Sequence, residues 1–287
     1  MEKLNKIVIV GVGLIGGSFA KGLKQAGLVN EMVGFGQNTD NLQKGIELGV
    51  IDSFTTDIAE AVTDADLVFL AVPLGAMHSV LQQMKPYLSS DTIVTDGGSA
   101  KGEVIRSAES VFGKLPVSFV PGHPIAGKEK SGVTAADAEL YVDHRVILTP
   151  TEITSVQALD TVKGLWSALG ANIEIMQAQQ HDEIFAATSH LPHLLAFSLV
   201  DMLNEHKELG DVFQYTAGGF RDFTRIASSD ATMWRDISLQ NSEAIAKWLK
   251  EYAANISHLT ELVESRDSEA LFKIFTDAKK ARDEHIA

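Results

Sequence analysis

A glycine-rich turn near the start of the sequence limits the fold more than any other feature. In "KIVIVGVGLIGGSFAKGL", an apolar run over residues 6–10 leads into Gly11, Gly13 and Gly16, and a helix-period segment follows. In a dinucleotide-binding turn the first glycine allows the tight bend, the second admits a pyrophosphate, and the third lets the helix pack closely on the strand. Free N–H groups at the start of the helix then meet the anionic phosphates. The sequence therefore predicts a strand–turn–helix unit that binds a dinucleotide.

Apolar runs and helix-period segments alternate through the first half of the chain. The predicted strands cover residues 6–10, 32–35, 66–73, 92–96, 117–121 and 144–150, and the predicted helices cover 14–26, 40–48, 75–85 and 101–112. Most of the strands are apolar on consecutive residues, as is typical of strands covered on both faces. The alternation predicts an α/β fold with a doubly wound, mainly parallel sheet of the Rossmann type. We expect a helix near 153–169 and a strand over 171–176 to complete this layer.

Strand signals stop after residue 176, and the rest of the sequence has a helical pattern. Near its end, apolar residues recur at steps of three and four and make one stripe along a helix. They are Leu249, Ala253, Ile256, Leu259 and Val263. We therefore expect a dinucleotide-binding domain over residues 1–176 and an all-α domain over 177–287. Helices with wide apolar faces often pair across a two-fold axis, so we expect the second domain to form a homodimer.

The charge balance limits the partners of this chain. Its 287 residues carry a net charge of −14, which repels nucleic acid and anionic membranes. An anionic ligand would therefore need a few arginine or lysine side chains to reverse the field locally. The sequence has no cysteine and no apolar run of the roughly 20 residues that span a membrane. Because a strand-like segment begins almost at residue 1, we expect no secretory signal. We expect a cytoplasmic protein.

The end of the second predicted strand bears on the choice of cofactor. In "VGFGQNTD", Gly36 stands where NAD sites place an acidic residue for the ribose hydroxyls, and the nearest base downstream is Lys44. Gln37, Asn38 or Asp40 could bind the ribose directly, so the sequence favours NAD and leaves NADP open. The residues expected to contact the cofactor are Gly11, Gly13, Leu14, Ile15, Gly16, Gln37, Val72 and Pro73.

His123 is the candidate general base. It lies in "FVPGHPIAGKEKSG", on a tight loop just after a predicted strand, at the edge where doubly wound sheets bind ligands. An enzyme that oxidises an alcohol with a nicotinamide cofactor needs a base for the hydroxyl proton, and the pKa of imidazole suits that task. Other histidines stand alone or among polar residues and are expected at the surface: His78, His144, His206, His258 and His285.

Ser99 lies at the end of another predicted strand, in "TDGGSAKGEV". It could cap the helix near 101–112, and its hydroxyl could also hydrogen-bond an imidazole and fix its tautomer. The two roles are compatible.

Two further clusters contribute candidate binding residues. In "ATSHLPHLL", His190 and His193 share a helix face, and Pro192 should disturb the preceding turn. No third ligand at recognised spacing accompanies them, so we expect a polar pair facing the cleft between the domains and no metal site. In "GGFRDFTRIASSDATMWRDI", Arg221 and Arg225 stand at i and i+4.

These two arginines lie among Phe220, Phe223 and Trp234, which suggests a partly buried cationic pocket for a small anionic substrate. A guanidinium in such a pocket would bind a carboxylate through two hydrogen bonds.

Taken together, these motifs resemble the prephenate/arogenate (cyclohexadienyl) dehydrogenase family of tyrosine biosynthesis. GVGLIGGS, DGGSAKG, GHPIAGKEKSG, SHLPH and GFRDFTRIASSDATMWRDI occur in family order over nearly the whole chain. The resemblance implies oxidative decarboxylation of prephenate to 4-hydroxyphenylpyruvate, or of arogenate to tyrosine, with transfer of a hydride to NAD(P)+. It leaves open which substrate and cofactor are preferred.

The resemblance also implies a role for each candidate residue. His123 would accept the ring hydroxyl proton and Ser99 would orient it. The substrate-binding residues would be His193 and Arg225, with Arg221 and Trp234 lining the pocket and Glu129 near its entrance. We expect neither a chorismate mutase segment before these motifs nor a regulatory domain after them, so if tyrosine inhibits we expect it to compete in the active site.

Two alternatives remain at this point. A β-hydroxyacid dehydrogenase would be expected to use a helix lysine, but residues 177–203 contain none. A non-enzymatic dinucleotide sensor would not need Ser99, His123, His193 and Arg225 together.

Overall fold

The computed structural model describes residues 3–128, 130–206, 208 and 210–286. The chain divides into two compact units, Met1–Ser242 and Glu243–Ala287, and each is described by itself. This division falls later than the expected boundary after residue 176. The reason is that Trp234 and Ile237 belong to the same apolar core as the sheet. The boundary at 176 stays a prediction.

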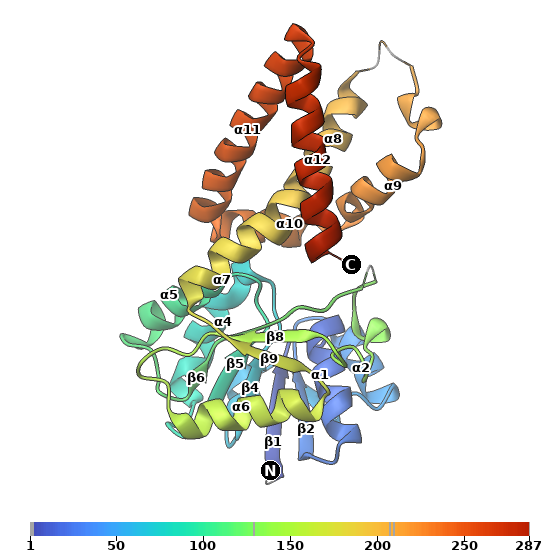
Figure 1. The fold of residues 1–287 in the computed structure, drawn as a ribbon. Coiled ribbons are helices and arrows are strands. Elements are labelled where there is room, and N and C mark those ends of the chain that lie inside the picture. Colours follow the sequence, from blue (N-terminus) through green and yellow to red (C-terminus); the bar gives the residue numbers. More distant parts are fainter. Residues whose placement is uncertain (1–2, 129, 207, 209, 287) are drawn as a thin grey trace. The chain divides into compact units, whose positions relative to one another are not determined.

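The first unit is built on a six-stranded sheet (Figure 1). Its strands are β1 (Leu4–Val10), β2 (Val29–Phe35), β3 (Ser53–Thr55), β4 (Leu67–Leu70), β5 (Ile93–Asp96) and β6 (Phe119–Val120). They lie in the order β3-β2-β1-β4-β5-β6 and every neighbouring pair is parallel. The predicted doubly wound sheet is confirmed, although the sequence pattern missed the short edge strand β3.

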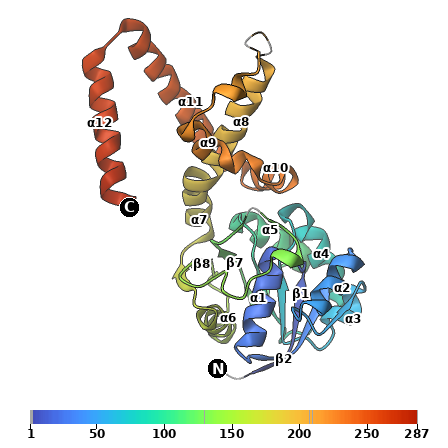
Figure 2. The same cartoon turned by 90° about the vertical axis from the view of Figure 1, so that its right-hand side faces the viewer.

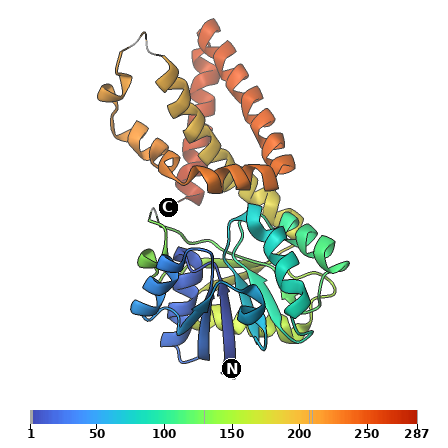
Figure 3. The same cartoon turned by 180° about the vertical axis from the view of Figure 1, so that it is seen from behind.

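Helices cover both faces of this sheet. They are α1 (Leu14–Gln25), α2 (Thr39–Glu47), α3 (Ile58–Val62), α4 (Met77–Met84), α5 (Lys101–Phe112) and α6 (Val156–Ala168). Figure 1 shows α6 in front of the sheet, and Figure 3 shows α4 and α5 on its other face. Alternate residues of β1 enter the two cores: Ile7 and Ile9 pack with α1 and α6, whereas Val8 and Val10 pack with α4 and α5.

The expectation that residues 144–150 and 171–176 complete the parallel sheet is wrong. Instead β8 (Arg145–Leu148) and β9 (Asn172–Ile175) form a separate three-stranded sheet with β7 (Gly122–Pro124). Strand β7 is antiparallel to β8, and β8 is parallel to β9. The chain leaves the first sheet at Pro121, which has no N–H to donate to a neighbouring strand. Its carbonyl accepts from the N–H of Thr149 at 2.9 Å and so joins the chain to the second sheet.

The remainder of the described chain is helical, as expected. The first unit continues with α7 (Ala178–Phe185), a π-helical turn η4 (Ala186–His190), α8 (Leu191–Glu205), α9 (Gly218–Thr224), η7 (Arg225–Ser228) and α10 (Ala231–Gln240). The second unit, from Glu243 on, contains α12 (Ser268–His285) and all but the first residue of α11 (Ser242–Ser265), which Figure 2 shows as two long helices that meet at a sharp bend. Along the predicted apolar stripe, Leu249, Ile256 and Val263 are exposed in the single chain. None of the helices in the described ranges is long and apolar enough to cross a membrane.

Candidate active site

The glycine turn has the geometry that a pyrophosphate requires. Gly11 has a φ of +96°, and a Cβ there would lie 2.5 Å from the carbonyl oxygen of Ala71. A Cβ on Gly16 would lie 2.7 Å from Cγ2 of Ile9, so β1 and α1 can pack closely only if this residue is glycine. Among the residues that the structure describes, no neighbouring atom comes within 4 Å of a Cβ built on Gly13, which leaves the approach to the backbone open. The N terminus of α1 has no side-chain cap and no acidic residue in its first turn, so it can accept an anion.

The other expected cofactor contacts lie around this turn or at the end of β2. The backbone nitrogen of Val72 would be 3.2 Å from a Cβ on Gly11, and Pro73 follows it. Gln37 is exposed, but the side chain of Asn38 accepts from the N–H of Asn41 at 3.0 Å and caps α2. Asn38 is therefore engaged in the fold, which leaves Gln37 and Asp40 as the candidates for the ribose.

Leu14 and Ile15 are the first two residues of α1, and both are half-buried. The carbonyl oxygen of Ile15 accepts from the hydroxyl of Tyr141 at 2.6 Å. Its Cγ2 would lie 3.1 Å from a Cβ on Gly97, which follows β5. The start of α1 and the end of β5 therefore lie against each other.

His123 lies within β7, paired with Ile147 of β8, and not on a loop after a strand as expected. The imidazole is half-buried, and its Nδ1 lies 2.8 Å from Nε2 of His181. The ring of Phe185 packs against it at a centroid distance of 5.1 Å. Nε2 is therefore the nitrogen left for a ligand. The five histidines expected at the surface are all exposed, which confirms that prediction.

A buried ion pair holds the backbone beside His123. Lys101 and Asp96 are both 0% exposed, and their side chains form a salt bridge. Nζ of Lys101 also donates to the carbonyl of Gly122 at 2.6 Å, while Oδ1 of Asp96 accepts from the N–H of Gly122 at 3.0 Å. Because Asp96 ends β5, this clamp ties His123 to the carboxyl edge of the parallel sheet, where the glycine turn also lies.

The electrostatic surroundings keep His123 neutral. Burial lowers its pKa well below the ordinary value, and the neighbouring His181, Lys101 and His190 lower it further. Burial also lowers the pKa of Lys101, against the raising effect of Asp96. A neutral imidazole at neutral pH can accept a proton, as a general base must.

Ser99 does not cap α5, so that expectation is wrong. The capping position is Ala100, which makes no side-chain bond, and the carboxylate of Asp182 accepts from the N–H groups of Lys101 and Gly102 at 2.8 Å each. Within the described residues the hydroxyl of Ser99 has no hydrogen bond, and His123 is bonded to His181 instead. Sequence reasoning missed His181, although the carboxylate that follows it in "QQHDEIF" is a signal for an oriented imidazole.

Trp234 brings His190 and His193 together. His193 stacks on the indole at a centroid distance of 3.7 Å and His190 meets its edge at 6.1 Å, which confirms that both face one side. Nδ1 of His193 donates to the carbonyl of Ser189 at 2.9 Å, so its Nε2 is free to accept. Pro192 explains the π-helical turn before it, because its ring would crowd the carbonyl four residues earlier in a regular α-helix.

The two arginines differ from the expectation. Helix α9 ends at Thr224 and Arg225 begins η7, so they do not share a continuous α-helix face, and both are exposed in the single chain. Arg221 donates to the carbonyl of Thr216 at 3.1 Å. Burial lowers the pKa of His193 and the charge of Arg225 lowers it further, against the raising effect of the bond to Ser189. Arg225 begins η7, which packs against α8, the helix of His193.

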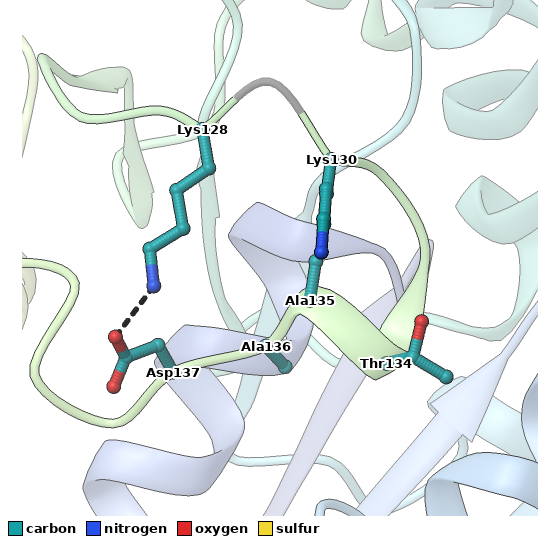
Figure 4. Close-up of a pocket in the computed structure, with 6 residues that line it drawn as sticks. All are labelled: Lys128, Lys130, Thr134, Ala135, Ala136 and Asp137. Carbon is teal, nitrogen blue, oxygen red and sulfur yellow. Dashed lines mark hydrogen bonds and ion pairs between the residues drawn. The ribbon is translucent and has the colours of Figure 1, made fainter.

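The loop after His123 contains a separate cavity. It has a volume of about 440 Å³ and is lined by Lys128, Lys130, Thr134, Ala135, Ala136 and Asp137 (Figure 4). Nζ of Lys128 lies 2.6 Å from Oδ2 of Asp137. None of the histidines described above lines it. Glu129, expected near the entrance of the substrate site, lies outside the described residues. The part of the chain that the structure describes has no group of three or more side chains placed to hold a metal ion.

Sequence and structure comparisons agree on the relatives of this chain. One family model that matches, over residues 19–175, is the nucleotide-binding domain of prephenate dehydrogenase, and a second, over 177–277, is the dimerization domain of prephenate dehydrogenase. The sequence is 38% identical to the cyclohexadienyl dehydrogenase of Zymomonas mobilis, over 98% of this chain and 96% of that relative.

Solved structures of prephenate and arogenate dehydrogenases have a similar fold. The fold is similar to that of prephenate dehydrogenase from Aquifex aeolicus in complex with hydroxyphenyl propionate and NAD+, with a TM-score of 0.92, 40% identity and coverage of 98% of both chains. It is also similar to that of Synechocystis arogenate dehydrogenase, with a TM-score of 0.82, 27% identity, and coverage of 98% of this chain and 100% of that one.

Proposed function

The chain belongs to the prephenate dehydrogenase family, and on that premise we propose that it oxidises prephenate or arogenate with NAD+. The products would be CO2, the reduced cofactor, and 4-hydroxyphenylpyruvate or tyrosine, as a step of tyrosine biosynthesis. The observation that carries this proposal is His123, a neutral imidazole with a free Nε2 at the sheet edge that also carries the glycine turn. The open space at Gly13 and the uncapped start of α1 fit a dinucleotide.

Bound NAD+ would supply the hydride acceptor, held by the turn from Gly11 to Gly16. His123 would take the proton of the ring hydroxyl at Nε2, because Nδ1 is already engaged with His181. As the proton and the hydride leave the carbinol, the bond to the ring carboxylate would break, CO2 would depart, and the electrons of that bond would complete the aromatic ring as a phenolate. The phenolate oxygen would then take the proton back from Nε2 of His123, which gives the phenol of the product and restores the neutral imidazole. Loss of CO2 and aromatisation make the step effectively irreversible.

Charge complementarity supports an anionic substrate. The charge of Arg225, on η7, acts on His193 of the neighbouring α8, and together they offer a cation and a hydrogen-bonding imidazole in a protein of net charge −14. We propose that both bind substrate carboxylates, with His190, Arg221 and Trp234 around them, Glu129 near the entrance, and Ser99 beside His123. We also propose that residues 177–287 form the homodimer, since a family model described as a dimerization domain matches 177–277.

The test crosses prephenate and arogenate with NAD+ and NADP+ and follows absorbance of the reduced nicotinamide. His123→Asn should lower turnover by roughly 10²–10⁴-fold while NAD+ binding persists, because only proton acceptance is lost. The matched control is His78→Asn, at an exposed histidine of α4. Unchanged turnover in His123→Asn would remove this residue from the mechanism. Absence of turnover by the wild type with all four pairs would favour a dinucleotide sensor.

A further inference from the structure

Three side chains form a continuous hydrogen-bonded chain that ends on the proposed base. Oδ1 of Asp182 lies 2.8 Å from Nδ1 of His181, and Nε2 of His181 lies 2.8 Å from Nδ1 of His123. His181 is 0% exposed, so its imidazole depends on these two partners and not on water. Asp182 and His181 come from α7, whereas His123 comes from β7.

The proton positions in this chain follow from what each atom can donate or accept. Burial by itself would raise the pKa of Asp182, but hydrogen bonds from His181 and from two backbone N–H groups outweigh it and hold the pKa below its ordinary value. An ionised carboxylate can only accept, so Nδ1 of His181 carries a hydrogen. Burial lowers the pKa of His181, and in the neutral imidazole Nε2 must then accept. The hydrogen of His123 therefore lies on Nδ1, and its Nε2 keeps the lone pair.

The hydrogen-bonded side chains of Asp182, His181 and His123 are also held in place by their neighbours. The carboxylate of Asp182 accepts from the N–H groups of Lys101 and Gly102 at 2.8 Å each, which stops it from rotating away from His181. The ring of Phe185 packs against both imidazoles, at centroid distances of 5.1 Å to His123 and 4.5 Å to His181. The other charged or titratable groups that act on this chain are Lys101 of α5, Asp96 of β5 and His190 of η4.

We propose that Asp182 and His181 are positioning residues that keep the hydrogen of His123 on Nδ1 and leave Nε2 as the acceptor of the substrate's hydroxyl proton. They act through His123 and do not themselves meet the reacting atoms. When His123 takes the proton at Nε2, its Nδ1–H stays bonded to His181, and the carboxylate of Asp182 stabilises the positive charge formed. This inference rests on the proposed function and adds residues that set the base in its working tautomer.

The variant Asp182→Asn tests the direction in which the hydrogen bonds run from His123 through His181 to Asp182. With the amide oxygen at the position of Oδ2, it still accepts from the N–H of Gly102. The amide NH2 then takes the position of Oδ1, where it gives up the bond from the N–H of Lys101 but donates to Nδ1 of His181 and reverses its tautomer. His181 would then donate from its Nε2 to Nδ1 of His123. The hydrogen of His123 would move to its own Nε2, which could then no longer accept a proton. The turnover number should fall by roughly 10²–10⁴-fold, the effect expected when a catalytic imidazole is held in the wrong tautomer. The Michaelis constants for substrate and NAD+ should change little.

A pair of variants at His181 tests whether His123 needs a hydrogen-bond acceptor for its Nδ1–H. His181→Gln keeps a side-chain oxygen within reach of Nδ1 of His123, whereas His181→Leu removes the acceptor. Turnover should therefore be lower in the leucine variant than in the glutamine variant. Equal turnover in the two would overturn the proposal. Asp160→Asn, at an exposed carboxylate of α6, is the matched control for the amide substitution and should behave as the wild type.

Nitrogen-15 NMR of labelled imidazoles, which separates protonated from unprotonated ring nitrogens, gives a readout independent of turnover. The wild type should show His123 protonated on Nδ1, and Asp182→Asn should show it protonated on Nε2. A wild-type His123 protonated on Nε2, or an unchanged turnover number in a folded Asp182→Asn variant, would overturn the inference. If the wild type turns over no substrate, the proposed function fails, and the NMR result alone decides the tautomer.

Discussion

Mild acid should destabilise the folded protein, and His190 allows the size of the effect to be worked out. This side chain is 1% exposed, and Nδ1 lies 3.3 Å from the amide nitrogen of Asn241. Burial, with a smaller contribution from His181, lowers its pKa from 6.5 to about 4, against the raising effect of Asp182. The unfolded chain therefore takes up the proton at higher pH than the folded chain does.

The sign and the magnitude follow from proton linkage. A folded pKa below the unfolded one means that stability is complete above 6.5 and is lost as the pH falls towards 4. Between about pH 7.5 and about pH 5, the two pKa values correspond to a loss of about 2 kcal/mol in the free energy of unfolding from His190 alone. His123 and His181, whose pKa values are also lowered by burial, change stability in the same direction.

The measurement is urea unfolding of the wild type and of His190→Gln at these two pH values. The glutamine amide can still bond Asn241 but does not titrate, so the variant should lose about 2 kcal/mol less than the wild type on acidification. Few carboxylates bind protons above about pH 5, so they contribute little to the difference. An equal loss in the two proteins, or no loss in the wild type, would refute the reasoning.

Two other predictions concern the clamp and the glycine turn. Lys101→Met should lower the free energy of unfolding by about 3–5 kcal/mol, because it leaves the carboxylate of Asp96 buried without its partner. The double variant with Asp96→Asn should recover part of this loss in the same denaturation assay, and a single variant as stable as the wild type would contradict the clamp. Gly11→Ala should unfold at lower temperature than the wild type, because a Cβ there would lie 2.5 Å from the oxygen of Ala71 at a φ of +96°. Gly13→Ala, with nothing within 4 Å, should keep its stability but bind NAD+ more weakly in calorimetry, and wild-type affinity in that variant would argue against the pyrophosphate contact.

Local patterns in the sequence were enough to predict most of the elements of this fold. Consecutive apolar residues such as Ile7 to Val10 predicted buried parallel strands, and the glycine spacing predicted the turn after β1. The second sheet was not predicted, since an apolar strand fits either sheet by its pattern. What separates the sheets is Pro121. The hydrogen bonds of Gly122 with Lys101 and Asp96, more than twenty residues away, hold the start of the second sheet against the edge of the first.

The candidate site shows the same division between local and long-range information. The sequence by itself predicted that His123 lies at the ligand-binding edge of the sheet and that an imidazole there suits a base, but the tight loop expected around it is strand β7 in the structure. Only the tertiary structure decided which nitrogen is free, because that depends on His181 and Asp182, 58 residues or more along the chain from His123. It also decided that Asp182, and not Ser99, caps α5. Hydrogen-bond partners brought together by folding leave no periodic trace in the sequence, whereas strand, turn and helix preferences do.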